Sequence, residues 1–359
     1  MRSASGTPLT PGELGGEAPP RTRTGAEARP LAEAYDTALL DLDGVVYAGG
    51  EAVPHAVDAL EDARERGLRL AYVTNNAART PRTVAAHLTE LGVPAEPAEV
   101  ITSAQAVARL IAEDVPPGAP VLAIGAEGLR VALEERGLRV VDSADDGPAA
   151  VVQGYGGPGM PWERLMEAAL AVQRGVRWYA SNTDLTIPSA RGIAPGNGAA
   201  VEVVRIATRA MRPAPEPRVA GKPLPPMHRE SILRTGARRP LVVGDRLDTD
   251  IEGAYVGGVD SLLVLTGVTD AAQLLAAPPE CRPTFVAQDL RGLLVPHPEV
   301  TGSPAEGFVC EGWRADASGD GLELDGSGDP LDGLRALCAA TWNDPRTLDP
   351  DKALSKLGL

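Results

Sequence analysis

Short apolar runs alternate with stretches of helical periodicity from about Thr37 onward, and this alternation predicts an α/β fold. The first apolar run covers residues 38–40, a helical pattern begins near Pro54, and a second run covers residues 68–73. The order strand, helix, strand is typical of the repeating unit of a parallel sheet. The start of the chain therefore predicts a sheet whose strands end at a common edge.

The same pattern continues through most of the chain. Thr80 and Pro81 supply an N-cap and a first-turn proline for a helix that ends near Gly92, and Ser103 is expected to cap the next helix, which runs to Ala112. Strand patterns follow at 121–124, 151–152, 176–179, 241–243 and 261–265, and helical patterns at 127–135, 162–174, 198–211, 227–234 and 331–342.

Both ends of the chain differ from this pattern. Residues 1–34 contain five glycines and five prolines but no aromatic residue, so we expect a disordered tail. Beyond about Pro296 the chain becomes acidic, and we expect a small C-terminal α+β extension there.

Charge and composition exclude several classes of protein. The 49 acidic and 34 basic residues give a formal net charge of −15, which disfavours binding to nucleic acid. The three cysteines are widely spaced, so neither a disulfide framework nor a zinc site is indicated. No apolar run approaches the roughly 18 residues that cross a bilayer, and residues 1–34 lack the apolar segment of a signal peptide. We expect a soluble, cytoplasmic protein with no nucleic-acid or membrane partner.

Four polar segments each follow an apolar strand, where open α/β sheets form their ligand crevice. The first contains Asp41 and Asp43, which would share one face of an extended segment, and Gly44, which permits a sharp turn. Both carboxylates would then point into one site. An ordinary Asp-Gly turn explains the same residues equally well.

The second segment, Thr74 with Asn75 and Asn76, offers a hydroxyl and amides to phosphate oxygens, or simply caps a turn. The third contains Lys222, whose mobile positive charge suits a phosphoryl group. Only three of the 34 basic residues are lysines, so a lysine retained at this position indicates a function rather than a surface role.

The fourth segment carries Asp245, Asp248 and Asp250, and hard carboxylate oxygens of this kind suit Mg²⁺. In order and spacing, the four segments resemble those of the haloacid-dehalogenase-like hydrolase superfamily, and in detail those of its subfamily IIA. The resemblance covers about residues 36–292 and is carried by Asp41-Leu-Asp-Gly44, Thr74-Asn-Asn76, Gly221-Lys-Pro223 and Gly244-Asp-Arg-Leu-Asp-Thr-Asp-Ile251.

The resemblance implies a Rossmann-like α/β core with a parallel sheet, an inserted α/β cap domain and the C-terminal extension. The expected boundaries are 35–104 and 216–295 for the core, 105–215 for the cap and 296–359 for the extension.

Two pairs of residues in the expected cap are candidates for contact with the substrate. Loops at Asn182 and Asp184 are expected to face the substrate, although polar loop residues also commonly cap helices. Trp162 and Trp178 are expected to pack in the core of the cap or to form a wall of the substrate pocket.

The resemblance also implies a mechanism. Asp41 would be the nucleophile that forms an aspartyl-phosphate, and Asp43 would be the general acid and base. Mg²⁺, with Mn²⁺ or Co²⁺ as substitutes, would be held by Asp41, the backbone carbonyl of Asp43, and Asp245. Thr74 and Lys222 would bind phosphoryl oxygens as catalytic residues.

Further residues would support this site. The substrate would be bordered by Gly44, Asn75 and Asn76, while Asp248 and Asp250 would orient Lys222 or metal-bound water.

The implied activity is a magnesium-dependent phosphatase for small alcohol phosphate monoesters. The length and the C-terminal extension resemble members of the family that hydrolyse glycerol 3-phosphate. Phosphoglycolate, 4-nitrophenyl phosphate, pyridoxal phosphate and nucleotide monophosphates remain alternative substrates. A non-catalytic phospho-acceptor of a signalling pathway is an alternative of another class, which the second aspartate, Asp43, disfavours. Apart from the small phosphorylated substrate, a second copy of the chain is a possible partner.

Overall fold

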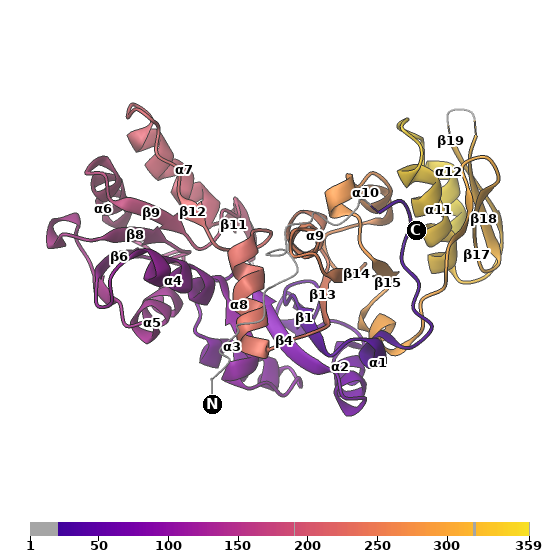
Figure 1. The fold of residues 1–359 in the computed structure, drawn as a ribbon, viewed down its shortest axis with the longest axis horizontal. Coiled ribbons are helices and arrows are strands. Elements are labelled where there is room, and N and C mark those ends of the chain that lie inside the picture. Colours follow the sequence, from indigo (N-terminus) through magenta and orange to yellow (C-terminus); the bar gives the residue numbers. More distant parts are fainter. Residues whose placement is uncertain (1–20, 190, 319–320, 359) are drawn as a thin grey trace, which may run out of the picture. The chain divides into compact units, whose positions relative to one another are not determined.

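Residues 37–40 form the first strand of a parallel sheet. All four of their side chains are buried, as is typical of a strand that is covered on both faces. The structure is a computed structural model, and it describes residues 21–189, 191–318 and 321–358 (Figure 1). Within it the chain forms two compact units, and each is described separately. The first unit combines Met1–Leu70 with Ala237–Leu359, and the second is Ala71–Gly236.

The first unit contains a parallel sheet in the order β15-β14-β13-β1. Its strands are β1 (Thr37–Leu40), β13 (Pro240–Gly244), β14 (Asp260–Val264) and β15 (Phe285–Ala287). Leu40 lies opposite Val243 in the register of β1 and β13, so the carboxyl ends of these two strands are adjacent. The segments that begin at Asp41 and Asp245 therefore leave the sheet side by side.

Short elements complete this part of the unit. They are α1 (Leu31–Ala34), β2 (Tyr47–Ala48), β3 (Glu51–Ala52), α2 (Ala56–Glu65), a π-helical turn η4 (Leu247–Ile251), α9 (Glu252–Val256), α10 (Ala271–Leu275), η5 (Pro279–Cys281) and η6 (Leu290–Leu294).

The C-terminal part of the first unit is an antiparallel sheet with two helices, which confirms the expected α+β extension. Its elements are β16 (Thr301–Ser303), β17 (Gly307–Cys310), β18 (Trp313–Ser318), β19 (Gly321–Gly326), α11 (Pro330–Trp342) and α12 (Asp351–Leu357). Buried side chains of α11 and of this sheet share one hydrophobic cluster with Leu263 and Val286 of the parallel sheet.

The expected disorder of residues 1–34 is wrong for residues 21–34. Leu31 is completely buried, the amide of Gly25 donates to the carbonyl of Thr284 over 2.7 Å, and Nη1 of Arg23 donates to the carbonyl of Val300 over 2.9 Å. Composition alone missed these contacts because backbone groups and arginines of the segment bind other parts of the unit. Residues 1–20 lie outside the described residues.

The second unit contains a parallel sheet in the order β12-β9-β8-β6-β7, with α6 and α7 over one face and α4 and α5 over the other (Figure 1). Its further strands include the parallel pair β4 and β5 and the antiparallel pair β10 and β11.

The strands of this unit are β4 (Arg69–Thr74, which begins in the first unit), β5 (Val100–Thr102), β6 (Pro120–Ile124), β7 (Arg139–Val141), β8 (Ala150–Gln153), β9 (Arg177–Ala180), β10 (Thr186–Ser189), β11 (Gly192–Pro195) and β12 (Arg218–Val219). The helices are α3 (Pro81–Glu90), η2 (Pro97–Glu99), α4 (Ser103–Asp114), α5 (Glu127–Glu135), η3 (Ala144–Asp146), α6 (Trp162–Gln173), α7 (Asn197–Thr208) and α8 (Pro225–Thr235).

Capping residues behave as expected in one helix and differ in the next. The hydroxyl of Thr80 accepts the amide of Thr83, which confirms the predicted cap of α3. Thr102, not Ser103, caps α4, because its hydroxyl accepts the amide of Gln105. Ser103 is the first helical residue, and its hydroxyl donates instead to the carbonyl of Asn75 over 2.5 Å.

The two tryptophans of this unit differ in burial. Trp178 is 4 % exposed and packs in the core of the unit, as predicted. Trp162 is 65 % exposed, so the prediction that it packs in this core is wrong. The reason is the orientation of α6, which turns Leu165 and Ala168 toward the sheet.

The predicted boundaries of core, cap and extension stay predictions. Among the described residues, no helix is long and apolar enough to span a membrane.

Glu230 on α8 is a buried charge that connects three helical segments. Its carboxylate accepts from Arg136 over 2.9 Å, from Arg234 over 2.5 Å and from Nε of Arg109. Burial raises the pKa of Glu230, but the hydrogen bonds from Arg109 and Arg234 outweigh it and hold the pKa below its ordinary value. The ionised form is therefore the one that the fold stabilises.

We expect Glu230→Gln to lower the free energy of unfolding by about 3–5 kcal/mol, because it leaves three arginines around a neutral group. Because the pKa is lower in the folded protein, the stabilising effect is present above the unfolded-state pKa and is lost as the pH falls through the folded-state pKa. Urea unfolding between pH 7 and pH 3 measures both effects.

The matched control is Glu113→Gln. Glu113 also pairs with an arginine, Arg229, over 2.9 Å, but the two side chains are 41 % and 42 % exposed. This variant should change stability by less than about 1 kcal/mol. Equal stability losses in the two variants would contradict a special role for the buried carboxylate.

Candidate active site

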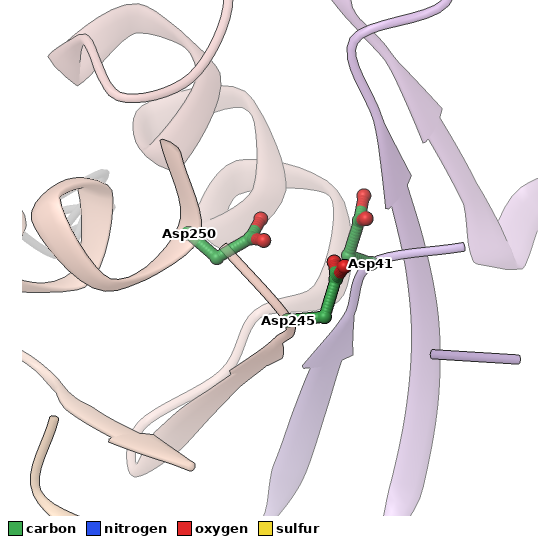
Figure 2. Close-up of side chains that lie close together, drawn as sticks. All are labelled: Asp41, Asp245 and Asp250. Atoms are coloured by element: carbon green, nitrogen blue, oxygen red, sulfur yellow. The ribbon is translucent and has the colours of Figure 1, made fainter. Parts of the chain in front are cut away.

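Three aspartates form a cluster of carboxylates in the first unit. Asp41 directly follows β1, Asp245 directly follows β13, and Asp250 lies in η4. Each offers a carboxylate oxygen, and these oxygens all lie within 4.8 Å of one another. Figure 2 shows the three carboxylates turned toward one another. Asp245 and Asp250 are each 1 % exposed, whereas Asp41 is half-buried and open to a substrate.

The loop after β14 holds Asp245 and the turn beyond Asp41. The amide of Val268 donates to Oδ2 of Asp245 over 2.7 Å, and the amide of Thr269 donates to the carbonyl of Asp245 over 3.2 Å. The hydroxyl of Thr266 donates to the carbonyl of Gly44 over 2.6 Å. Sequence reasoning missed this loop because it belongs to none of the four polar segments.

Glycines leave the space that the carboxylates occupy. A Cβ at Gly44 would lie 2.5 Å from Oδ2 of Asp245, and Gly44 has a φ of +83°, which disfavours any other residue. A Cβ at Gly267 would collide with Asp245, and a Cβ at Gly244 would collide with Asp250. The three glycines thus allow the backbone to approach both buried aspartates closely.

The donor set fits a divalent cation with hard oxygen ligands. Carboxylates this close repel one another strongly when two of them are out of water, and a bound Mg²⁺ would relieve the repulsion. Asp41 and Asp245 were both predicted as ligands. Asp250, predicted only to support the site, also lies within the cluster, whereas a role of Asp43 through its backbone carbonyl stays a prediction.

Asp43 is exposed, and its neighbour Leu42 is 1 % exposed. Leu42 is therefore buried in the protein while the aspartates on either side of it are open to a substrate. A tight turn follows, in which the amide of Gly44 donates to the carbonyl of Tyr47 over 2.8 Å and the amide of Val46 donates to the carbonyl of Leu42 over 2.9 Å.

Asp248 and Asp250 lie in the same π-helical turn but in different surroundings. Asp248 has a side chain that is 67 % exposed and pairs with Nη2 of Arg246 over 2.8 Å. Oδ2 of Asp250 accepts the backbone amide of Arg246 over 3.3 Å. The structure thus brings Asp250, and not Asp248, into the carboxylate cluster.

The predicted phosphate-binding residues lie in the second unit. Thr74 is the last residue of β4 and is 5 % exposed. Its hydroxyl accepts the amide of Asn76 over 3.1 Å, and Oδ1 of Asn76 accepts the amide of Ala78 over 2.8 Å. Both side chains therefore shape the turn after β4, which is the structural alternative that the sequence left open.

Asn75 connects three segments of this unit. Its Nδ2 donates to the carbonyl of Lys222 and to Oδ2 of Asp184, each over 3.2 Å, and its Oδ1 accepts the amide of Lys222 over 2.8 Å. Nζ of Lys222 donates to the carbonyl of Val73 over 3.2 Å. The structure therefore brings Lys222 and Asp184 to the end of β4, beside Thr74.

Asn182 is 4 % exposed and also contacts Asn75 and Asp184. Its Nδ2 donates to the carbonyl of Asn75 over 2.7 Å, and its Oδ1 accepts the amide of Asp184 over 3.2 Å. Asn197 in turn donates to the carbonyl of Asn182 over 2.7 Å. These contacts support a positioning role for Asn182, and a direct contact with substrate stays a prediction.

We expect Gly267→Ala to weaken Mn²⁺ binding about 10- to 100-fold, because the new methyl group displaces the carboxylate of Asp245. Titration with Mn²⁺, followed by electron paramagnetic resonance, measures this without any substrate. Gly159→Ala is the matched control, since a Cβ at Gly159 meets open space. Equal Mn²⁺ affinities in the two variants would contradict the close approach of Gly267 to a metal ligand.

Comparisons with known proteins agree with this geometry. The chain matches the family model of haloacid dehalogenase-like hydrolases over residues 38–139, a related HAD-hydrolase-like model over 219–293, and a GCN5-related N-acetyltransferase-like domain over 310–359. It is 43 % identical to the D-glycerol 3-phosphate phosphatase of Mycobacterium tuberculosis, and the match covers 87 % of each of the two chains. It is also 36 % identical to an acid sugar phosphatase of Staphylococcus haemolyticus, over 71 % of this chain and 94 % of that one.

Solved structures give the same result. The chain resembles the glycerol phosphate phosphatase of Mycobacterium tuberculosis in complex with magnesium, with a TM-score of 0.82 and 41 % identity over 92 % of this chain and 99 % of the other. It resembles the p-nitrophenyl phosphatase of Archaeoglobus fulgidus with a TM-score of 0.65 and 29 % identity, over 72 % and 98 %. These similarities confirm the predicted α/β fold, and the chain belongs to the haloacid dehalogenase-like hydrolases.

Proposed function

We propose that this chain hydrolyses small alcohol phosphate monoesters, with glycerol 3-phosphate as the preferred substrate, to the alcohol and inorganic phosphate. The family and its phosphatase relatives make the chain a phosphoric monoester hydrolase, as predicted. The choice of glycerol 3-phosphate is supported by the relative that is 43 % identical and by the solved relative that shares 99 % of its length with this chain.

One observation carries the proposal: the carboxylates of Asp41, Asp245 and Asp250 meet where β1 and β13 end, with Asp43 exposed two residues after Asp41. Asp41, Asp245 and the backbone carbonyl of Asp43 would hold Mg²⁺, and Asp250 lies close enough to contribute directly or through water. Magnesium would supply positive charge beside the phosphoryl group and keep Asp41 ionised. Magnesium in the solved relative supports this choice, and Mn²⁺ or Co²⁺ would substitute.

The reaction we propose has two displacements at phosphorus. A carboxylate oxygen of Asp41 attacks phosphorus, the ester P–O bond breaks, and the departing alkoxide takes the proton of Asp43. Asp43 then removes a proton from water, the water oxygen attacks phosphorus, and the bond to Asp41 breaks to release phosphate. Asp43 suits both proton transfers because its side chain is exposed to substrate and water.

Thr74 and Lys222 would bind the remaining phosphoryl oxygens, where charge builds up in the transition state. Their local geometry supports this role, because the hydrogen bonds of Asn75 fix the backbone of Lys222 beside the end of β4. Gly44, Asn76 and Asp184 would border the alcohol part of the substrate. The proposed location is the cytoplasm, which agrees with three buried cysteines that are all free thiols.

The first test is phosphate release from a panel of esters by wild type, Asp41→Asn and Asp43→Asn, with and without Mg²⁺. The panel contains both glycerol 3-phosphate enantiomers, phosphoglycolate, pyridoxal phosphate, UMP and 4-nitrophenyl phosphate. We expect glycerol 3-phosphate to have the highest kcat/KM. We expect Asp43→Asn to lose about 10²- to 10⁴-fold in kcat, which is the usual contribution of a positioned acid, and Asp41→Asn to be inactive.

Asp58→Asn, an exposed aspartate on α2, is the control and should keep wild-type kcat. A higher kcat/KM for another ester would overturn the substrate but not the mechanism. A wild-type protein that retains phosphate on Asp41 without turnover would instead support a phospho-acceptor.

We expect Thr266→Val to lower kcat about 10-fold with little change in KM, because it removes the hydrogen bond that fixes the carbonyl of Gly44 next to Asp43. Thr266→Ser keeps the hydroxyl and should restore most of kcat. Steady-state kinetics of both variants is the measurement. A valine variant with wild-type kcat would show that the turn holds Asp43 without this bond.

A further inference from the structure

Two short segments of the second unit, residues 182–185 and residues 196–198, are joined by the hairpin of β10 and β11. The first segment carries Asp184, and the second begins α7. Thr186 lies opposite Pro195 in the hairpin, so the two segments leave its base next to each other. Contacts between the two segments therefore decide where Asp184 lies.

Two glycines allow the backbones of the segments to approach closely. The amide of Gly196 donates to the carbonyl of Leu185 over 2.8 Å, and the amide of Gly198 donates to the carbonyl of Asp184 over 2.8 Å. A Cβ at Gly196 would collide with the carbonyl oxygen of Asp184, and a Cβ at Gly198 with that of Thr183. Gly196 has a φ of −91°, which any residue adopts, so lack of space is what requires a glycine there.

The residue between the glycines, Asn197, holds the first segment through its side chain. Its Nδ2 donates to the carbonyl of Asn182 over 2.7 Å and to the carbonyl of Gln153, the last residue of β8, over 3.3 Å. Gln153 is completely buried, its Nε2 donates to the carbonyl of Ala200 over 3.0 Å, and its Oε1 accepts Nε1 of Trp178 over 2.8 Å. Asn182 is thus tied through Asn197 to β8, and β8 is tied to β9 and to the first turn of α7.

Asp184, which these contacts position, lies beside the lysine that binds phosphate in the proposed reaction. Nδ2 of Asn75 donates to Oδ2 of Asp184 and to the backbone carbonyl of Lys222, each over 3.2 Å. One amide group therefore connects the carboxylate to the base of the lysine. An ionised carboxylate accepts hydrogen bonds and donates none, so at this place it suits hydroxyl groups in the alcohol part of an ester.

We propose that Gly196, Asn197 and Gly198 are positioning residues that make this phosphatase selective for hydroxylated alcohols. They hold residues 182–185 so that the carboxylate of Asp184 accepts a hydrogen bond from a substrate hydroxyl. The inference rests on the proposed function, and it adds a substrate class, the polyol phosphates, and the residues that select it. The three residues act through the carbonyls of the first segment and not through the substrate.

The phosphate end of the site has support of its own. The hydroxyl of Ser103 donates to the carbonyl of Asn75 over 2.5 Å, and Oδ1 of Asn75 accepts the amide of Lys222 over 2.8 Å. Neither hydrogen bond involves the two segments. A change at Asn197 should therefore alter recognition of the alcohol more than binding of the phosphate.

The primary measurement compares glycerol 3-phosphate with n-propyl phosphate, which is the same three-carbon ester without hydroxyl groups. The readout is the ratio of the two kcat/KM values. The amount of active enzyme cancels in this ratio, so a variant that is merely less stable keeps the wild-type value. We expect a wild-type ratio of about 100 or more, because a site that binds a substrate hydroxyl discriminates against an analogue without it.

Asn197→Ala should lower the ratio about 10-fold or more, mainly through kcat/KM for glycerol 3-phosphate. Gly198→Ala should lower it as well, because its methyl group displaces Thr183, although alanine otherwise favours a helix. Asp184→Ala should lower the ratio at least as much. Adding Asn197→Ala to Asp184→Ala should have no further effect on the ratio, because the asparagine acts through the aspartate.

Two controls match these variants. Asn343→Ala removes hydrogen bonds of the same kind in the first unit, where Nδ2 of Asn343 donates to the carbonyls of Thr22 and Ala339 over 2.7 and 2.8 Å. Gly159→Ala adds a methyl group in the second unit where a Cβ meets open space. Both should keep the wild-type ratio.

Hydrogen exchange tests the contact between the segments without any substrate. The amides of Gly196 and Gly198 should exchange about 10-fold faster in Asn197→Ala than in wild type, because the carbonyls that accept them are held less firmly. Mass spectrometry of peptides that contain these glycines is the measurement, and Asn343→Ala should leave their exchange unchanged.

Different results would overturn the inference and the proposed function. A selective wild type whose ratio is unchanged in Asn197→Ala and Gly198→Ala would overturn the inference alone, and so would a further decrease when Asn197→Ala is added to Asp184→Ala. A wild type that hydrolyses both esters equally well would overturn the selectivity for hydroxyl groups. A wild type that hydrolyses neither ester would overturn the proposed function and the inference together.

Discussion

Mutual repulsion among three aspartates is the constraint on which the catalytic part of the first unit depends. Oxygens of Asp41, Asp245 and Asp250 lie within 4.8 Å of one another, and two of these side chains are almost completely buried. A site of this kind is costly unless a cation binds there, so the backbone around it must hold the carboxylates in place before the cation arrives. Hydrogen bonds from the loop after β14 to Asp245 and to the turn at Gly44 provide that support.

In the second unit, a neutral side chain holds a charged residue in position. An amide side chain, Asn75, fixes the backbone of Lys222 through both its oxygen and its nitrogen, and also contacts Asp184. The long side chain of Lys222 is thus anchored at its base, which lowers the entropy that is lost when its ammonium group binds an anion. The helix that follows Lys222 is α8, and the carboxylate of Glu230 is buried farther along it. This carboxylate accepts hydrogen bonds from Arg109 and Arg136.

The sequence predicted the elements and residues that depend on local pattern. Continuous apolar runs marked β1 and β13, and the polar residues after them marked the cluster, because parallel strands end at one edge. It could not separate Asp248 from Asp250, since both are aspartates within one turn. It also missed the role of Thr266, whose partner Gly44 is 222 residues away in the chain. Such roles arise from tertiary contacts that no local spacing encodes.

Trp162 shows the same limit for packing. Helical periodicity correctly predicted a helix from residue 162, but α6 carries apolar side chains on more than one face, and the sheet can cover only one of them. The face that is covered carries Leu165, Ala168 and Val172, which are buried in the hydrophobic cluster of the unit. Trp162, the first residue of the helix, lies outside this cluster and is exposed. An apolar residue in a helix is therefore buried only where its face of the helix is turned toward the core, and α6 leaves Trp162 open to solvent.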